Sequence, residues 1–163
     1  MKKIIFVATL MAASFSASAA DTMIKLPIAG ALAVNDAEKR LDEGVKFYFA
    51  GQQTPKVLTK ITSDKTSQRT NGFGKSAEKS CNWVFLSAML ALQKRAKEVG
   101  ANAVINIVSN FKDVEMASAT EFECADGAIM AGVALKGTSS RSPSRQVTIG
   151  ISAGLLHNIP LRN

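Results

Sequence analysis

The chain has 163 residues, a formal net charge of +7 and 47% hydrophobic residues. This length accommodates one domain with short appendages. With 20% charged residues, 11 glycines and 4 prolines, the composition excludes collagen-like, coiled-coil and wholly disordered chains. Beyond the first twenty residues, no apolar run is long enough to span a bilayer.

The N-terminus has the parts of a secretory signal. Lys2 and Lys3 form a charged region, residues 4–15 form an apolar region, and the small residues 17–19 precede a predicted cleavage site. A retained anchoring helix is the alternative, but the apolar region is shorter than the ~20 residues that a spanning helix needs. No cysteine near the cleavage site offers a lipid acceptor. We therefore expect the signal peptide, 1–19, to be removed and the mature chain to be a soluble periplasmic protein without a membrane span.

Export would leave the mature domain with a much smaller net charge than the whole chain. The signal and the C-terminal tail together hold five of the twenty basic residues, so residues 20–137 carry fifteen basic against thirteen acidic groups, a net charge of +2. Along 36–46 and 94–98, basic residues are interleaved with acidic ones. A nucleic-acid-binding surface concentrates its basic residues on one face. The charges therefore indicate a solvated surface and no nucleic-acid partner.

A short helix is predicted over residues 35–41. Asn35 or Asp36 can cap its N-terminus, and Gly44 can end it. The helix would lead directly into the first predicted strand.

Two strands are predicted next, at 45–49 and 56–62. Both segments alternate in polarity, and Gly51 separates them, which predicts a β-hairpin. The following segment, 63–76, is polar throughout and predicts a loop of about fourteen residues, a length typical of functional or mobile loops.

A long helix is predicted from residue 77 to residue 99. Ser76 is the expected N-cap, the helix dipole favours Glu78 in the first turn, and Gly100 is placed to end the helix. Apolar residues at three- and four-residue spacing form its core stripe. They are Phe85, Ala88, Met89, Leu92, Ala96 and Val99.

Trp83, Leu86 and Leu90 form a second apolar ridge on the flank of this helix. A soluble monomer does not normally leave three large apolar side chains in water. Either residues 23–34 cover the ridge from within the chain, or a partner covers it. The ridge is therefore a candidate partner surface.

Three further strands are predicted after the long helix. Residues 103–108 and 128–135 are nearly continuous apolar runs, typical of central strands. Residues 119–124 alternate in polarity, and the Asp126-Gly127 pair supplies a turn to the last strand. We therefore expect an α+β fold in which one long helix packs on a mostly antiparallel sheet of about five strands.

The domain is expected over 20–137. Residues 138–163 begin with a linker-like composition of serine, arginine and proline, and are expected to form a low-order tail. The tail carries the single histidine of the chain, His157. A histidine-dependent triad or a histidine-rich metal site is therefore not expected.

Cys81 opens the long helix, and Cys124 ends the strand at 119–124. In an oxidising compartment this pair would form a disulfide closing a loop of about 44 residues. Redox catalysis is the alternative, but the two residues lack the Cys-x-x-Cys spacing, and a helix N-terminus can lower the pKa of a thiol without creating an enzyme. We favour the structural disulfide.

Two runs of the chain carry a family resemblance. The first is 77–108, with Cys81 at the start of a helix and Gly100-Ala101-Asn102-Ala103-Val104 leading into a strand. The second is 124–135, which reads CADGAIMAGVAL. Together they resemble the YbjQ/RcsF-like group of small bacterial domains. The resemblance covers about half of the body and implies an α+β fold in which Cys81 pairs with Cys124. It also implies a role in the cell envelope, such as stress sensing, and the YbjQ group forms oligomers.

Gly74, Lys75 and Ser76, at the start of the long helix, imitate the end of a phosphate-binding loop. Similar short exported proteins with these residues and Thr70-Asn71-Gly72 are labelled excinuclease ATPase subunits. Backbone amides at a helix N-terminus together with a lysine attract phosphate. A full loop needs glycine where this chain has Arg69, so we expect at most an anion site at these three residues.

No catalytic residue, cofactor or metal site is predicted. Glu121 and Glu123 lie on one strand face, an arrangement more typical of a solvated edge than of an acid/base pair. We therefore expect a non-enzymatic envelope module for binding or stress sensing, which contacts a protein partner through the 63–76 loop or the Trp83 ridge. A self-assembling homo-oligomer is the alternative, followed by a nucleotide- or anion-binding protein.

Overall fold

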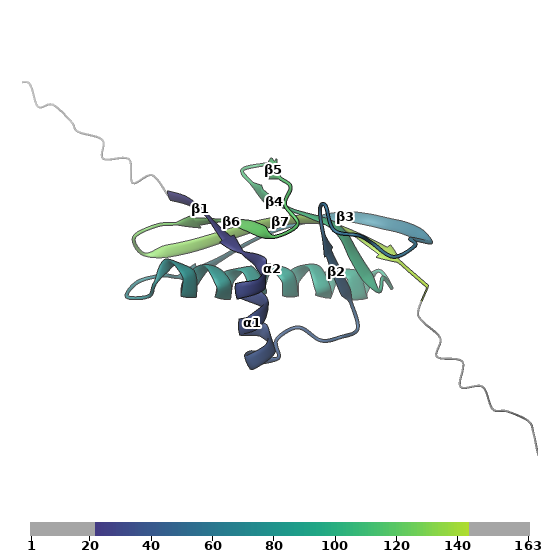
Figure 1. Ribbon diagram of the computed structural model, residues 1–163, viewed down its shortest axis with the longest axis horizontal. Helices are drawn as coiled ribbons and strands as arrows, with labels where there is room; N and C mark the ends of the chain where they lie inside the picture. Colours follow the sequence, from purple (N-terminus) through teal and green to yellow (C-terminus); the bar gives the residue numbers. More distant parts are fainter. Residues whose placement is uncertain (1–21, 144–163) are drawn as a thin grey trace, which may run out of the picture.

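Two helices and one sheet of seven strands form the α+β fold of this computed structural model, which describes residues 22–143 (Figure 1). The α+β class is confirmed, but the expected single helix on five strands is wrong. In chain order the elements are β1 (Thr22–Pro27), α1 (Ile28–Glu38), β2 (Lys46–Phe49), β3 (Thr59–Asn71), α2 (Ala77–Glu98), β4 (Ala103–Phe111), β5 (Val114–Met116), β6 (Glu121–Asp126) and β7 (Met130–Arg141).

Strand β7 is the centre of the sheet. On one side it pairs with β3 over its whole length, from Met130 opposite Asn71 to Arg141 opposite Thr59. On its other side it pairs first with β6 and then with β4. β1 extends the sheet beyond β6, and β2 extends it beyond β4. All pairings in the described residues are antiparallel except that of β2 with β4, so the sheet is mixed but mostly antiparallel, as expected.

Helix α2 forms where it was predicted. The Ser76 hydroxyl accepts a hydrogen bond from the amide of Lys79 at 3.2 Å, and Gly100, with a φ of +69°, follows the last turn. The helix lies along one face of the sheet (Figure 1).

The predicted core stripe of α2 is buried against that face, except that Val99 is only half-buried. Phe85 in this stripe contacts Phe49 of β2 and Phe122 of β6, with ring centroids 6.0 Å and 4.2 Å apart. The aromatic cluster therefore joins the helix to both branches of the sheet, the one that runs through β6 and the one that ends at β2.

The predicted helix at 35–41 is wrong at both ends. Helix α1 starts at Ile28, directly after a proline, and stops where Lys39 takes a left-handed backbone with a φ of 52°. Asn35 lies near the end of α1, where its Oδ1 accepts a hydrogen bond from the amide of Leu41 at 2.7 Å. The alanine-rich first turns favour a helix, but no polar N-cap marks its start in the sequence.

The predicted hairpin of 45–49 with 56–62 is also wrong. β2 forms close to the predicted position, but it pairs in parallel with β4. β3 starts at Thr59 and pairs with β7. A parallel pair of strands far apart in the chain needs no tight turn between them, so no local pattern marks it.

The predicted loop at 63–76 is wrong as well, since residues 63–71 belong to β3. Even-numbered side chains from Thr62 to Thr70 are half-buried on the face that packs against α2, while odd-numbered ones are exposed. Both sets are polar, so the strand has no apolar alternation. The threonines favour β structure, but the strand is stabilised mainly by its pairing with β7, which no local pattern indicates.

β7 continues to Arg141, so residues 138–141, assigned to the tail from the sequence, belong to the sheet. Asn102 secures the end of the strand: its Nδ2 donates to Ser142 O at 2.9 Å, and its Oδ1 accepts from Ser142 N at 2.8 Å. The predicted signal peptide and the rest of the tail lie outside the described residues.

A disulfide joins Cys81 of α2 to Cys124 of β6, as predicted. The two Cα atoms are 5.9 Å apart, and both side chains are fully buried. The bond ties the helix to the sheet at the end opposite the β2 strand.

Removing the disulfide should lower the free energy of unfolding by about 4 kcal/mol, because the bond closes a long loop in the unfolded chain. Urea denaturation of the protein and of a Cys81→Ala/Cys124→Ala variant, both without reductant, measures the difference. The same protein with reductant is the control for the substitutions. A loss below about 1 kcal/mol would contradict the stabilising role.

Candidate functional site

Residues 22–143 hold no group of three or more histidine, cysteine, aspartate or glutamate side chains able to bind a metal ion. In the same part of the chain, no helix is long and apolar enough to cross a membrane. The candidate binding sites are therefore the hollows and the exposed charged or apolar surfaces.

A hollow of about 860 Å³ lies on the face of the sheet opposite α2, and we call it the outer groove. Val133 and Leu135 of β7 point into the core, so the residues that alternate with them point away from α2. Lys65 and Arg69 of β3 line one wall. The floor consists of small residues of β6 and β7, namely Ala125, Gly132 and Ala134.

Gly132 leaves the groove open above the floor because it has no side chain. A Cβ atom at this position would lie 3.6 Å from the carbonyl oxygen of Gln68 and 3.7 Å from Cγ of Arg69, both ordinary contact distances. The backbone therefore has room for a small side chain here, and any larger one would fill the groove.

The β4–β5 hairpin forms the opposite wall. It projects from the sheet on the side away from α2 (Figure 1). Its two turn residues, Lys112 and Asp113, have φ values of 52° and 62°, as in a type I′ turn. The turn thus places a cation and an anion above the floor of the groove.

Two ion pairs hold this hairpin against the sheet. Lys65 Nζ lies 2.5 Å from Asp113 Oδ1, and Lys136 Nζ lies 2.6 Å from Glu115 Oε1. Lys65 and Lys136 are cross-strand partners, so their like charges would repel each other without the two carboxylates. The hydrogen bond from Lys65 lowers the pKa of Asp113, and a second one from Asn110 Nδ2 lowers this pKa further.

The outer groove combines apolar surface with positive charge. Ile129 and Met130, at the β6–β7 turn, are 63% and 45% exposed. Arg69 and Lys112 lie on opposite walls and form no ion pair within the described residues. A ligand with an apolar body and a negative group would match this lining.

Gly74, Lys75 and Ser76 form the exposed turn between β3 and α2. Gly74 has a φ of +70°, which favours glycine. The ammonium of Lys75 donates to the carbonyl of Asn71 at 2.9 Å, and the Ser76 hydroxyl caps the helix. Both polar side chains thus have partners within the chain, and the anion site stays a prediction.

The predicted ridge of Trp83, Leu86 and Leu90 is largely covered from within the chain. Leu86 is fully buried and Leu90 half-buried, whereas Trp83 is 43% exposed. α1 packs against α2, and the Arg40 guanidinium lies 4.0 Å from the centroid of the Trp83 ring. Trp83 is therefore the one member of the ridge with a large exposed surface.

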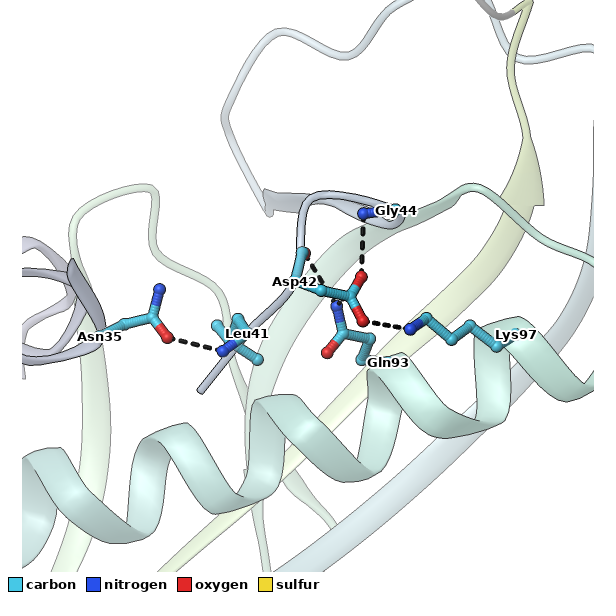
Figure 2. A network of polar contacts seen from close by, with 6 residues as sticks. All are labelled: Asn35, Leu41, Asp42, Gly44, Gln93 and Lys97. Atoms are coloured by element: carbon cyan, nitrogen blue, oxygen red, sulfur yellow. Dashed lines mark hydrogen bonds and ion pairs between the residues drawn. The ribbon is translucent and has the colours of Figure 1, made fainter. Parts of the chain in front are cut away.

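A polar network ties the segment between α1 and β2 to α2 (Figure 2). The Asp42 carboxylate accepts hydrogen bonds from Gly44 N at 2.9 Å and Gln93 Nε2 at 3.0 Å, and it forms an ion pair with Lys97. The hydrogen bond from Lys97 lowers the pKa of Asp42. A smaller hollow of about 390 Å³ lies beside this segment. Because three groups of the same chain engage the carboxylate, the network fixes the segment in place.

The chain matches no family model and no curated protein. The resemblance to the YbjQ/RcsF-like group therefore stays a prediction that these comparisons do not test.

The residues of the outer groove were not predicted. Lys65 and Arg69 were assigned to a loop, where their side chains share no face. The Lys112-Asp113 turn contains no glycine, which is the usual mark of a type I′ turn. Ile129 was placed inside a buried strand. The alternation of Lys65, Ser67 and Arg69 is the one pattern that points to a common wall.

Replacing Lys65 with methionine should raise the pKa of Asp113 toward the ordinary value of an aspartate. Because the folded-state pKa is depressed, the ion pair stabilises the fold above the unfolded-state pKa, and this stabilisation is lost as the pH falls through the folded-state pKa. NMR titration of the Asp113 carboxyl carbon measures the change. Lys79→Met, outside the groove, is the control. An unchanged Asp113 pKa in Lys65→Met would show that the hairpin is not held by this pair.

Proposed function

We propose that this protein is a non-enzymatic binding module of the cell envelope, exported in soluble form to the periplasm, with its ligand in the outer groove. One observation carries the proposal. Two cations without carboxylate partners among the described residues, Arg69 of β3 and Lys112 of the β4–β5 turn, line a groove whose floor of small residues ends at exposed Ile129 and Met130.

The lining favours an amphipathic ligand with one negatively charged group. The volume of the groove falls within the ~300–1,000 Å³ range of small-molecule sites. An apolar body would cover Ile129 and Met130, and a carboxylate or phosphate would accept charge-assisted hydrogen bonds from the two cations, which are stronger than neutral hydrogen bonds. A stress sensor of the envelope would meet such molecules as membrane-derived amphiphiles.

The disulfide supports the proposed compartment. Disulfides persist in oxidising compartments such as the periplasm and are rare where cellular thiols keep cysteines reduced. Both cysteines of the chain form the buried bond between α2 and β6. Together with the predicted signal peptide, this favours an exported protein.

A self-assembling envelope protein is the second candidate. Val114, Ile129 and Met130 are large exposed apolar side chains, and a second copy could remove them from water. Sedimentation at high protein concentration separates the two candidates, since the binding module is expected to be a monomer.

Nucleotide binding at residues 74–76 has less support. A phosphate-binding loop requires a glycine-rich turn that begins at position 69. Arg69 instead lies within β3, in regular pairing with Gly132 of β7.

Dodecyl phosphate, which has an apolar chain and a terminal anion, should bind the exported protein at concentrations below micelle formation. Isothermal titration calorimetry measures the affinity. Lys112→Glu should weaken binding about tenfold, because an attractive contact becomes repulsive. Lys94→Glu, an exposed position on α2, is the matched control and should change the affinity less than about twofold.

Two results would overturn this proposal. Dodecyltrimethylammonium, which has the same chain with a cation, would bind as tightly as dodecyl phosphate. Alternatively, the Lys112→Glu and Lys94→Glu variants would bind dodecyl phosphate equally well.

A further inference from the structure

The outer edge of β3 is open along the strand. β3 pairs with β7 on one side, and no described residue pairs with its other side. The strand has 13 residues, whereas strands usually have ~5–6. Proteins commonly shorten, bulge, charge or cover such edges, because unpaired main-chain groups are a template for another strand. From Thr62 to Asn71, β3 has neither a bulge nor a proline.

The register identifies which main-chain groups face this edge. Gly72 N donates to Ile129 O at 2.9 Å. Because hydrogen-bonded pairs alternate along an antiparallel ladder, the even-numbered residues 62–70 direct their main-chain groups to β7. The odd-numbered residues 63–69 direct theirs to the open edge. The carbonyl of Asn71, which also faces outward, accepts from the Lys75 ammonium.

The charges beside this edge are positive. Lys65 and Arg69 project from one face of β3, and Lys65 is partly neutralised by Asp113. On the other face, Asp64 is already paired with Arg95 of α2 at 3.0 Å. Pairing two β3 edges would bring the cations of both copies together. A strand with acidic side chains would instead place opposite charges there.

We propose that the β3 edge binds an extended acidic segment of another protein, added to the sheet as a further strand. The main-chain groups of the odd-numbered residues 63–69 supply the hydrogen bonds, and the side chains of Lys65 and Arg69 select carboxylates at alternate positions. The inference does not rest on the groove ligand, because the hydrogen bonds come from main-chain groups at the open edge of β3, although the side chains of Lys65 and Arg69 line the groove as well.

A fluorescently labelled peptide of alternating glutamate and valine tests the proposal by fluorescence anisotropy. Ser67→Pro removes an amide that faces the open edge and leaves the hydrogen bonds to β7 in place. It should weaken binding at least about tenfold. Ser67→Ala, the matched control, keeps the amide and should bind as the unmodified protein does.

Arg69→Glu provides a second test that does not alter the backbone, and it should weaken binding several-fold at low salt and less at high salt. Circular dichroism confirms that each variant is folded. Three results would overturn the proposal: a folded Ser67→Pro variant that binds normally, equal binding of an alternating lysine and valine peptide, or a dimer in which a second copy occupies the edge. Binding of dodecyl phosphate is measured separately, so failure of either proposal leaves the other standing.

Discussion

The main chain of β7 forms hydrogen-bonded ladders on both of its edges, and the other elements depend on this double pairing. β3 takes one edge for its full length, while β6 and β4 share the other. Gly137 permits the close approach of β4. A Cβ atom there would lie 2.7 Å from Val104 Cγ1 and 3.2 Å from Ile107 Cγ1, and β4 bulges between Ile105 and Val108 at this point. A side chain at position 137 would therefore clash with the side chains of Val104 and Ile107, which would have to shift.

One face of β7 packs in the core and the other forms the floor of the outer groove. Val133 and Leu135 pack with α2 in the core, whereas Gly132 and Ala134 form the floor of the outer groove. The same division places the disulfide and the aromatic cluster on the helix side. On the groove side, β4 leaves β7 to form the hairpin with β5, which two ion pairs bind to the sheet. The groove thus forms because β4 and β6 share one edge of β7 and the β4–β5 hairpin rises beside that edge.

Local patterns predicted the elements whose own residues mark them, by a cap, an apolar stripe or a continuous apolar run. α2 has a cap, a stripe and a terminal glycine, and β4 is a continuous apolar run, so both were found; the disulfide followed from the only two cysteines. Residues 63–71 of β3 were missed because both faces of the strand are polar, and the helix at α1 was misplaced because no polar cap marks its start. The groove depends on β3 and on a turn without glycine. The groove residues could therefore be identified only once the pairing of β3 with β7 was known.

Amide hydrogen exchange along β3, measured residue by residue by NMR, tests the pairing of β3 with β7 most directly. The structure predicts slow exchange for the even-numbered amides from residue 64 to residue 70, which bond to β7, and fast exchange for the odd-numbered amides from 63 to 69 at the open edge. Fast exchange throughout would mean that this segment is a loop and would contradict the account. Slow exchange throughout would mean that another strand covers the edge.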